Sequence, residues 1–395
     1  MKVVQINTVC DSDSTGKICA GISCSLNLSG IDNYIIYTSG YSSLPQGIRC
    51  AEKFPKFQAL RSRILGNYGF NAKNATKCII TELSRIDPDI VLLHNIHSHN
   101  VHLGELFAYL KAKQIKVLWT FHDCWAFTGY CPYFDMVECD HWQTGCHDCP
   151  QWTRYSWFVD RSSDIYKKKK VLFTGLDLTI ITPSRWLADN VKRSFLKNYP
   201  VRVIHNGIDL DVFQPKASCF REKYNIAQNK FVLLGVASKW VARKGLDVFI
   251  KLAKELNSEI FQIVLVGTDS NVDRELPDNV ISIHRTENQN ELAEVYSSAD
   301  LFVNPTMEEN FPTVNIEAIA CGTPVLTYKT GGSSEMLDQK TGVVVERNDT
   351  VALLEAIERI QNEKPFLKED CRNKALEFCY KKKFSEYVQL IQEFL

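Results

Sequence analysis

The chain has 395 residues, more than one ordinary hydrophobic core accommodates, so we expect two domains. Hydrophobic residues make up 45% and charged residues 23% of the sequence, which is typical of a globular protein and excludes a disordered one. The 46 Lys and Arg residues balance the 46 Asp and Glu residues, so the overall charge predicts no nucleic-acid partner.

The beginning of the chain does not resemble a secretion signal, because its apolar run is interrupted at Gln5 and Asn7. No apolar stretch approaches the roughly 20 residues that a membrane-spanning helix needs. Most of the 14 cysteines stand singly in apolar segments, as is usual in a reducing compartment. We therefore expect a cytoplasmic protein.

Short β-rich runs alternate with helical patterns along almost the whole chain. The runs are continuously apolar rather than alternating, which is typical of parallel strands covered on both faces. Strands are expected at 2–6, 34–38, 90–93, 116–121, 178–182 and 201–205, and then at 231–236, 261–266, 280–284, 301–304, 324–328 and 342–345. Helices such as 245–257 and 349–361 separate them. This order predicts α/β domains with doubly wound parallel sheets.

The series of strands is interrupted by the turn residues of 206–215, NGIDLDVFQP. We therefore place a first domain at 1–205 and a second at 206–375, and expect the last helix, 376–395, to pack back on the first. Ligands of doubly wound sheets bind beyond the carboxyl ends of the strands. With two such sheets, the expected site lies in the cleft between them.

The first strand-to-helix turn, TVCDSDSTGKICAG at 8–21, is close to a nucleotide-phosphate loop. A P-loop requires G-x-x-x-x-G-K-[ST], but Asp11 occupies the first glycine position and Ile18 replaces the Mg²⁺-binding hydroxyl. We interpret the segment as a βα turn whose helix start faces an anion, with Gly16 free to adopt unusual backbone angles.

The strongest functional pattern is PTMEENFPTVNIEAIACGTP at 305–324, which directly follows an expected strand. A proline favours a helix that begins near residue 313, so Glu309 is expected on the loop and Glu317 on the helix. The free amides at the helix start suit a diphosphate, and the carboxylates suit sugar hydroxyls. Two solvated glutamates on a surface helix are the alternative.

The segment ENFPTVNIEAIACGTPV resembles the E-x7-E signature of retaining glycosyltransferases of family four, which have the two-domain GT-B fold. Five further segments are similar to those of the family, in the family's order: ITPSRWLADNV (181–191), VIHNGIDLDVFQP (203–215), ASKWVARKGLDVFIKLA (237–253), ELAEVYSSADLFVNPT (291–306) and TGGSSEML (330–337). The resemblance implies transfer of a hexose-type sugar from a nucleotide-sugar donor to a hydroxyl of a glycan or lipid-linked glycan. It also implies a role in surface polysaccharide or lipopolysaccharide synthesis and no catalytic metal.

The resemblance assigns roles to individual residues. Glu309 would contact the donor hexose, Glu317 the ribose and Lys244 the donor diphosphate. A fixed cation has an independent reason there, because the departing diphosphate gains charge in the transition state; a solvated lysine is the alternative. His122 stands at the family's active-site histidine, so His122, Glu309 and Lys244 are expected to be catalytic.

Ser238 stands where many family members have an arginine, six residues before the lysine. Either Lys239 or Arg243 substitutes for it, or this chain uses one cation fewer. The base is expected near Thr286. The expected donor-binding residues are Gly16, Ser238, Lys239, Arg243, Lys244, Thr286, Glu309, Asn310, Phe311, Thr313, Val314 and Glu317.

The first domain is expected to bind the acceptor. His122 and Asp123 follow a strand and would orient a hydroxyl; a core histidine satisfied by the backbone is the alternative. His94 and His97 follow another strand, in HNIHSHNVH, and are read as acceptor-site polarity. The resemblance places STGK near the donor diphosphate and the acceptor, with Lys17 adding charge.

A cysteine-rich insert is expected at 124–150. Cys131, Cys139, Cys146 and Cys149 are spaced C-x7-C-x6-C-x2-C, and the final tight pair favours a tetrahedral thiolate site. The insert has little apolar periodicity, so a structural zinc would supply its order. Disulfides and free buried thiols are the alternatives.

Two segments, 52–73 and 166–173, mix apolar and basic residues. They predict either solvated helix faces or a patch that binds the anionic inner face of the plasma membrane. For the whole chain, the alternatives to a glycosyltransferase are a sugar-nucleotide epimerase on the same fold and a non-catalytic, zinc-bearing interaction module.

Overall fold

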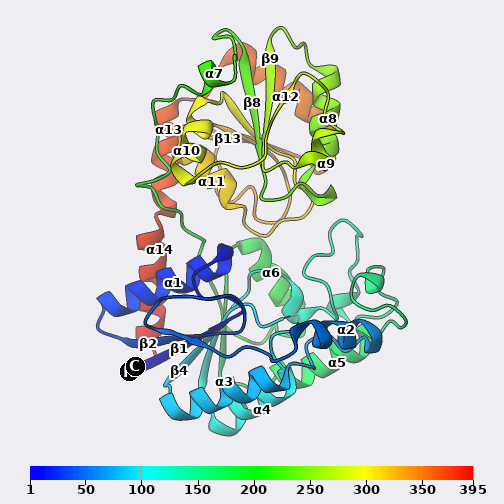
Figure 1. Ribbon diagram of the computed structural model, residues 1–395, viewed down its shortest axis with the longest axis vertical. Helices are drawn as coiled ribbons and strands as arrows, with labels where there is room; N and C mark the ends of the chain where they lie inside the picture. Colours follow the sequence, from blue (N-terminus) through cyan, green and yellow to red (C-terminus); the bar gives the residue numbers. More distant parts are fainter. Residues whose placement is uncertain (98, 395) are drawn as a thin grey trace. The chain divides into compact units, whose positions relative to one another are not determined.

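The structure is a computed structural model that describes residues 1–97 and 99–394. It divides the chain into two compact units (Figure 1). Unit 1 comprises Met1–His205 and the C-terminal segment from Lys381, and unit 2 comprises Asn206–Tyr380. Each unit is described separately.

Unit 1 contains a seven-stranded parallel sheet in the order β3-β2-β1-β4-β5-β6-β7. Its strands are β1 Lys2–Asn7, β2 Asp32–Tyr37, β3 Gly47–Arg49, β4 Ile90–Leu93, β5 Lys116–Thr120, β6 Leu178–Thr182 and β7 Val201–Val203. Its helices within residues 1–205 are α1 Asp13–Leu28, α2 Pro55–Leu65, α3 Lys73–Ile86, α4 Leu103–Lys113, α5 Ser162–Phe173 and α6 Arg185–Arg193. Short 3₁₀ turns are η1 Trp125–Phe127, η2 His141–Gln143 and η3 Trp152–Arg154.

Unit 2 contains a six-stranded parallel sheet in the order β10-β9-β8-β11-β12-β13. Its strands are β8 Phe231–Val236, β9 Phe261–Val266, β10 Val280–Ile283, β11 Leu301–Asn304, β12 Val325–Tyr328 and β13 Gly342–Val345. Its helical elements are α7 Phe220–Lys223, η4 Ala242–Lys244, α8 Leu246–Glu255, α9 Ser270–Asp273, α10 Gln289–Ser298, α11 Thr313–Ala320, α12 Thr350–Glu363, α13 Lys368–Ala375 and η5 Leu376–Phe378. The predicted fold class, two doubly wound parallel sheets, is therefore confirmed.

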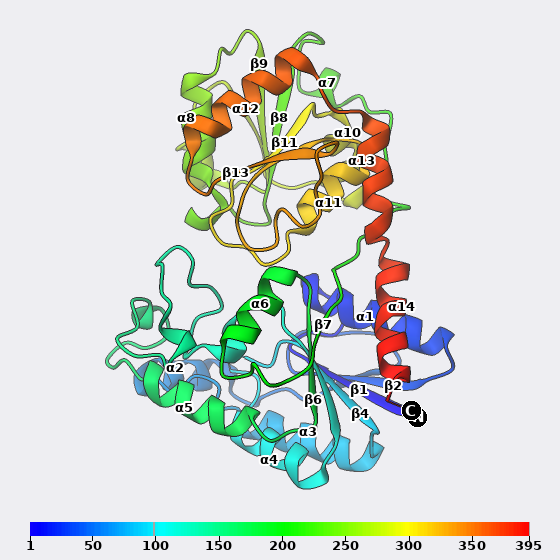
Figure 2. The same ribbon diagram turned by 180° about the vertical axis from the view of Figure 1, so that it is seen from behind.

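The last helix, α14 Tyr380–Gln392, belongs to unit 1 (Figure 2). Its Phe384 ring lies so close to Gly21 of α1 that a Cβ there would stand 1.9 Å away. The Tyr387 hydroxyl lies 3.4 Å from the Thr120 hydroxyl at the end of β5. The chain returns to unit 1 at residue 381 rather than at the predicted 376. The preceding segment stays in unit 2 because the Ile208 amide donates a hydrogen bond to the Phe378 carbonyl at 2.9 Å.

Two features of unit 1 differ from the sequence prediction. Strand β3, Gly47–Arg49, was not predicted; its Gly-Ile-Arg sequence has a single apolar residue. Cys50 and Cys78 form a disulfide between the segment after β3 and helix α3, whereas the sequence pattern predicted reduced thiols. Both side chains are brought together by packing against the same core, which spacing along the chain does not reveal.

Candidate functional site

The order of strands in unit 1 reverses between β1 and β4. Doubly wound sheets bind ligands at this topological switch point, beyond the carboxyl ends of the strands. Asn7 and Thr8 leave β1 here, His94 follows β4, and His122 follows β5. These four polar residues therefore lie at the carboxyl ends of neighbouring strands, where a ligand is expected to bind.

A chain of hydrogen bonds fixes two histidines of this cluster, the buried His94 and the partly buried His122. The Gln5 amide nitrogen donates to the Cys19 carbonyl at 3.0 Å, which leaves the Gln5 oxygen to accept from His94 Nε2 at 3.1 Å. His94 Nδ1 is then an acceptor, and His122 Nε2–H donates a hydrogen bond to it at 3.2 Å. The rings stack with centroids 5.5 Å apart. Sequence analysis missed Gln5, which it read only as an interruption of an apolar run.

Burial keeps both rings uncharged. Loss of hydration lowers the pKa of His122 to about 4, while Asp123 raises it and His97 lowers it further. Burial, assisted by His122, also holds the pKa of His94 well below its ordinary value. At neutral pH the pair is therefore a relay of neutral hydrogen-bonding groups.

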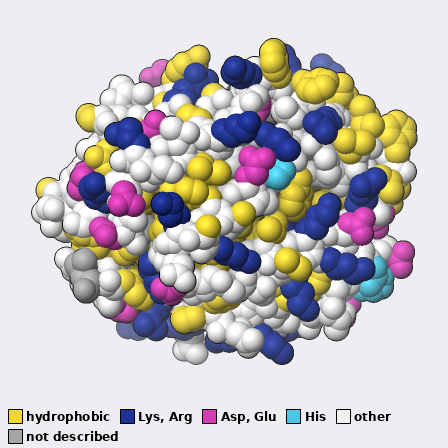
Figure 3. Space-filling model, turned by 90° about the horizontal axis from the view of Figure 1, so that it is seen from below, with side chains coloured by type: hydrophobic (Ala, Val, Ile, Leu, Met, Phe, Trp, Pro, Cys, Tyr) yellow, Lys and Arg dark blue, Asp and Glu magenta, His cyan; other side chains and the backbone are white. Residues whose placement is uncertain are grey.

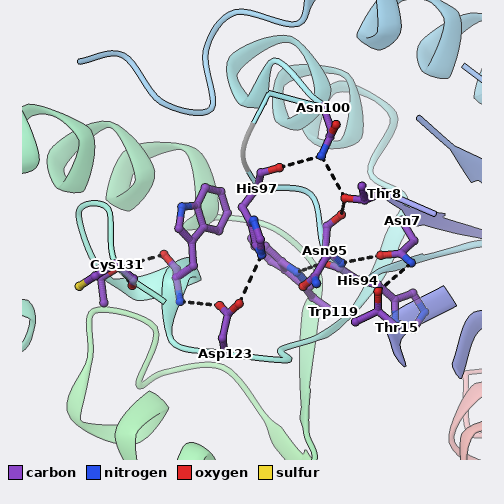
Figure 4. A network of polar contacts seen from close by, with 12 residues as sticks. Asn7, Thr8, Thr15, His94, Asn95, His97, Asn100, Trp119, Asp123 and Cys131 are labelled. Atoms are coloured by element: carbon purple, nitrogen blue, oxygen red, sulfur yellow. Dashed lines mark hydrogen bonds and ion pairs between the residues drawn. The ribbon is translucent and has the colours of Figure 1, made fainter. Parts of the chain in front are cut away.

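Asp123 supplies the negative charge of the same cluster. Its carboxylate lies 3.3 Å from His97 Nε2 and accepts the Trp125 amide at 2.9 Å (Figure 4). Burial opposes ionisation of Asp123, but the His97 ring and the Trp125 amide outweigh it and lower its pKa. Asn100 links the His97 carbonyl to the Thr8 hydroxyl, at 3.2 and 3.1 Å. Three predicted acceptor-side residues, His94, His97 and Asp123, thus lie in one network with the predicted catalytic residue His122.

The predicted phosphate-facing turn differs in detail. Helix α1 already begins at Asp13, so Gly16 and Lys17 lie in its first turns rather than on a loop. Gly16 has no positive φ; a Cβ there would stand 3.1 Å from the Asp11 amide and from the Val9 side chain. The glycine is needed for close packing of the preceding turn, and the Lys17 side chain is exposed.

A cavity of about 440 Å³ opens beside this network, between the end of β2 and helix α2. Its lining includes Ser39, Arg49, His99 and Asn100. Asn100 thus belongs both to the cavity and to the network around His97. Sequence analysis did not predict this cavity, because its walls come from segments about fifty residues apart.

In unit 2 the strand order reverses between β8 and β11, and the loops after these two strands carry opposite charges. Lys244 Nζ lies 2.6 Å from Glu309 Oε2, and Arg243 Nη1 lies 3.7 Å from the same oxygen. Arg243 also donates to the Glu308 carbonyl at 3.0 Å. Lys244 and Glu309 remain 18% and 14% exposed, so a ligand reaches them without unfolding the loops.

Glycines allow the backbone to approach Glu309 closely. Gly245 has φ +74°, and a Cβ there would stand 2.5 Å from the Pro305 carbonyl. Gly331 has φ +53°, and a Cβ there would stand 1.7 Å from the Glu309 carbonyl. The next amide, of Gly332, donates to the Asn310 carbonyl at 2.8 Å. The TGGSSEML segment thus holds the acidic loop in place.

The remaining predicted donor residues surround this loop to different degrees. Helix α11 begins at Thr313, as predicted, and Thr313 and Val314 are partly exposed. The Glu317 carboxylate accepts the Tyr296 hydroxyl at 3.1 Å. Asn310 and Phe311 are buried, Ser238 and Lys239 are exposed on the loop after β8, and Thr286 lies between β10 and α10. Arg243, rather than Lys239, accompanies Lys244 at the acidic loop.

The insert 124–150 orders itself more than the sequence indicated. Trp142 stacks on Phe134 with centroids 4.9 Å apart and lies 5.1 Å from Phe127, so aromatic packing supplies a core without apolar periodicity. The four cysteines are free thiols. Within residues 1–97 and 99–394, no group of three or more His, Cys, Asp or Glu side chains is arranged to hold a metal ion as it stands. None of the helices in this part of the chain has the length and hydrophobicity needed to cross a bilayer.

Comparison with protein families gives two matches that together cover most of the chain. Residues 26–212 match the family model described as Glycosyltransferase Family 4, and residues 218–378 match the model described as Glycosyl transferases group 1. The two matches meet close to the boundary between the units.

Curated relatives are similar over parts of their length. A putative colanic acid biosynthesis glycosyl transferase of Escherichia coli (strain K12) is 24% identical over 68% of this chain and 66% of the relative. A capsular polysaccharide biosynthesis glycosyltransferase of Staphylococcus aureus is 29% identical over 40% of this chain and 44% of the relative. The chain thus spans less than two thirds of these relatives.

Solved structures are similar over nearly the whole chain. Sucrose-phosphate synthase from Thermosynechococcus elongatus has a TM-score of 0.72 at 18% identity and covers 99% of this chain and 98% of its own. The Anabaena protein HepE in complex with UDP has a TM-score of 0.69 at 13% identity and covers 100% of both chains. At these identities the matches establish the fold alone, which is the predicted GT-B fold.

Proposed function

Because the chain belongs to the glycosyltransferases of family 4 and group 1, we propose that it transfers a hexose-type sugar from a nucleotide-sugar donor with retention of configuration. The acceptor is a hydroxyl of a glycan or lipid-linked glycan, in surface polysaccharide synthesis. The cluster of Lys244, Arg243 and Glu309 at the switch point of unit 2 is the observation that carries the proposal.

The cationic pair is suited to a diphosphate. Glu309 Oε2 lies 2.6 Å from Lys244 Nζ, so the carboxylate holds the ammonium in position at this loop. A donor diphosphate takes over the ammonium and guanidinium, and the released carboxylate accepts hydroxyl hydrogens of the hexose. The fixed cations then stabilise the charge that develops on the leaving phosphate.

Retention proceeds by front-face attack, in which the leaving phosphate takes the acceptor's proton. No carboxylate is assigned as a nucleophile at this loop, because Glu309 is assigned to the hexose hydroxyls and the Glu317 carboxylate accepts the Tyr296 hydroxyl. No catalytic metal is invoked. In unit 1, the neutral His122 orients a hydroxyl by hydrogen bonding, and the cavity beside Asn100 accommodates the acceptor.

The test of this function is a donor screen with purified protein. UDP-, GDP- and ADP-hexoses are each incubated with and without glycan acceptors, and the anomeric configuration of the product is read by NMR. Acceptor-dependent release of nucleoside diphosphate with retained configuration supports the proposal. Inversion, or acceptor-independent conversion of the sugar nucleotide, contradicts it, and the latter outcome identifies the alternative, an epimerase.

Matched variants connect the activity to the site. Glu309→Ala and Lys244→Ala are expected to stay folded and to lower kcat/KM about a hundredfold, on the order of 3 kcal/mol for one charged contact. Glu255→Ala and Lys251→Ala remove an exposed pair on helix α8, 3.9 Å apart, and serve as controls with unchanged activity. Near-normal turnover of the two site variants would leave the site assignment wrong and favour a non-catalytic module.

We also propose that unit 1 binds an anionic membrane surface peripherally. Helix α2 exposes Phe57 by 60%, and Phe54 before it by 66%. Trp157 and Phe158 are 52% and 73% exposed, and the Trp157 amide joins the Arg63 carbonyl of α2 at 2.8 Å, so the aromatic side chains come from adjoining segments. The basic residues of the helix segment are Lys53, Lys56, Arg61 and Arg63.

This combination of exposed aromatic and basic side chains fits an interface of acyl chains and anionic headgroups. A view of one face of the molecule shows Lys and Arg side chains interspersed with hydrophobic ones (Figure 3). The cavity of about 440 Å³ is lined by Pro55 and Lys56 of the same helix segment. A lipid-linked acceptor would therefore reach the cavity from the membrane surface.

A further inference from the structure

The cavity beside helix α2 in unit 1 is lined by two cationic side chains. Arg49 ends strand β3, Lys56 lies in the first turn of α2, and both border the cavity of about 440 Å³. Among residues 1–97 and 99–394, neither of them forms an ion pair with a carboxylate. Their charges are therefore available to a ligand.

Arg49 is oriented by a contact that leaves its hydrogen-bond donors free for a ligand. Its guanidinium carbon lies 4.2 Å from the centre of the Tyr41 ring. An aromatic face attracts a guanidinium through its π electrons, while the N–H groups point along the guanidinium plane, away from the ring. The planar fork of an arginine donates two parallel hydrogen bonds to an oxyanion.

Glu52, a carboxylate in the lining of the same cavity, is engaged elsewhere. The residue is only 8% exposed, and its Oε2 accepts the amides of Asn74 and Ala75 at 3.1 and 3.3 Å. Its Oε1 accepts the Asn74 side-chain amide at 2.9 Å and the Lys53 amide at 3.1 Å. The free amides at the start of a helix favour a negative charge, so Glu52 caps α3 rather than neutralising the two cations.

Other polar groups of the lining are uncharged. Ser39 and Asn100 present a hydroxyl and an amide, which suit sugar hydroxyls. Burial, assisted by the charge of Arg63, lowers the pKa of His99, so its ring is neutral at pH 7. Asn100 also donates to the His97 carbonyl, so a sugar bound beside it lies next to the acceptor network (Figure 4).

We propose that this cavity binds an acceptor sugar that carries a phosphate group, and that Arg49 and Lys56 hold the phosphate. The inference rests on the proposed function and names the class of acceptor. Two cations match a phosphate monoester, whose charge near pH 7 is about −1.5 to −2, whereas a carboxylate carries a single charge. The volume falls within the roughly 300–1,000 Å³ of small-molecule sites. The phosphate belongs either to a soluble sugar phosphate or to the diphosphate of a lipid-linked sugar, since both present the same anionic oxygens.

The experiment titrates the full chain in a calorimeter, without donor and at constant ionic strength. One arm compares hexose 1- and 6-phosphates with the same hexoses and with hexuronates, and a second arm uses a hexose joined through a diphosphate to a short prenyl chain. A phosphorylated compound is expected to bind about tenfold more tightly than the plain hexose, with inorganic phosphate competing. Binding in the second arm alone assigns the phosphate to a lipid-linked acceptor, and equal binding in both arms assigns it to a soluble one.

Two results of the titration overturn the proposal. One is equal affinity for phosphorylated and unphosphorylated compounds in both arms. The other is a hexuronate that binds as tightly as the phosphorylated compounds, because the cations would then recognise a carboxylate.

Variants assign the phosphate to its residues. Arg49→Gln and Lys56→Gln are each expected to weaken binding of the phosphorylated compound about tenfold. Lys77→Gln, at an exposed lysine of α3, removes the same charge and should leave the affinity unchanged. Tyr41→Leu is expected to weaken binding about threefold, the scale of an exposed cation–π contact. Unchanged affinity in both Arg49→Gln and Lys56→Gln overturns the subsite, and unchanged affinity in Tyr41→Leu overturns the orienting role of the ring.

The titration separates this inference from the proposed sugar transfer, because it needs no donor and no turnover. Phosphate-dependent binding that is lost in Arg49→Gln supports the subsite even where the donor screen finds no transfer. Transfer to unphosphorylated glycans with the same kcat/KM as to phosphorylated ones overturns the subsite and leaves the proposed function standing.

Discussion

The lowered pKa of the partly buried His122 leads to a quantitative prediction about stability. Its folded pKa is about 4 against an ordinary 6.5, so the fold favours the neutral ring. Because the folded pKa is the lower one, its stabilisation is present above pH 6.5 and is lost as the pH falls toward 4. Between pH 7 and pH 5 the loss from this residue is about 2 kcal/mol, out of about 3 kcal/mol for the complete titration.

The assay is urea unfolding of wild type and His122→Gln at pH 7 and at pH 5, followed by tryptophan fluorescence. Six of the seven tryptophans lie in unit 1, so the signal reports mainly the unit that contains His122. The wild type is expected to lose about 2 kcal/mol more free energy of unfolding than the variant over this range. His147→Gln, at a histidine that is 57% exposed, is the control and should behave as wild type. Equal pH dependence in wild type and His122→Gln would refute the reasoning.

Two further predictions concern the membrane surface and the acidic loop. Salt should release the protein from anionic vesicles, because the attraction is screened within about 8 Å at physiological ionic strength; Phe57→Ser and Phe158→Ser should weaken sedimentation with the vesicles and Leu367→Ser, exposed in unit 2, should not. Equal sedimentation with neutral and anionic vesicles would contradict the membrane proposal. Gly331→Ala is expected to displace the Glu309 loop and lower donor affinity in calorimetric titration, whereas Gly30→Ala, also at positive φ but in open space, should leave it unchanged. Equal donor binding by both glycine variants would show that the close approach of Gly331 to the Glu309 carbonyl is not needed for donor binding.

The strands of both sheets were predictable because buried parallel strands are continuously apolar. Strands such as 90–93, 231–236 and 301–304 have the predicted limits. Glu309 was predictable as a loop residue, since a strand precedes it and a proline starts the next helix. Local chemistry therefore locates those site residues that lie directly at the end of a strand.

Contacts between distant segments were not predictable in the same way. The bond from His94 to Gln5 joins residues 89 positions apart, and Gln5 occupies a strand position that apolar residues usually fill. Gly16 was expected to be free to adopt unusual backbone angles, but what it provides is room for the turn before it, which only the folded path of that turn reveals. The four cysteines carried a spacing pattern, whereas Lys169 lay in a basic run that gave no indication of its burial.

The switch points of the two units differ in charge: the one in unit 2 carries charged side chains, and the one in unit 1 carries neutral histidines. At the switch point of unit 2, Lys244 and Glu309 are charged and partly exposed, which suits a ligand that carries its own charge and exchanges partners with them. At the switch point of unit 1, the buried His94 and the partly buried His122 are neutral, which suits an uncharged hydroxyl that needs orientation rather than charge. The only carboxylate in the described network of unit 1, that of Asp123, is already engaged by His97 and a backbone amide. This difference supports the proposed binding of a diphosphate-bearing donor to unit 2 and of a hydroxyl acceptor to unit 1, because each ligand would then meet the charge that its own chemistry requires.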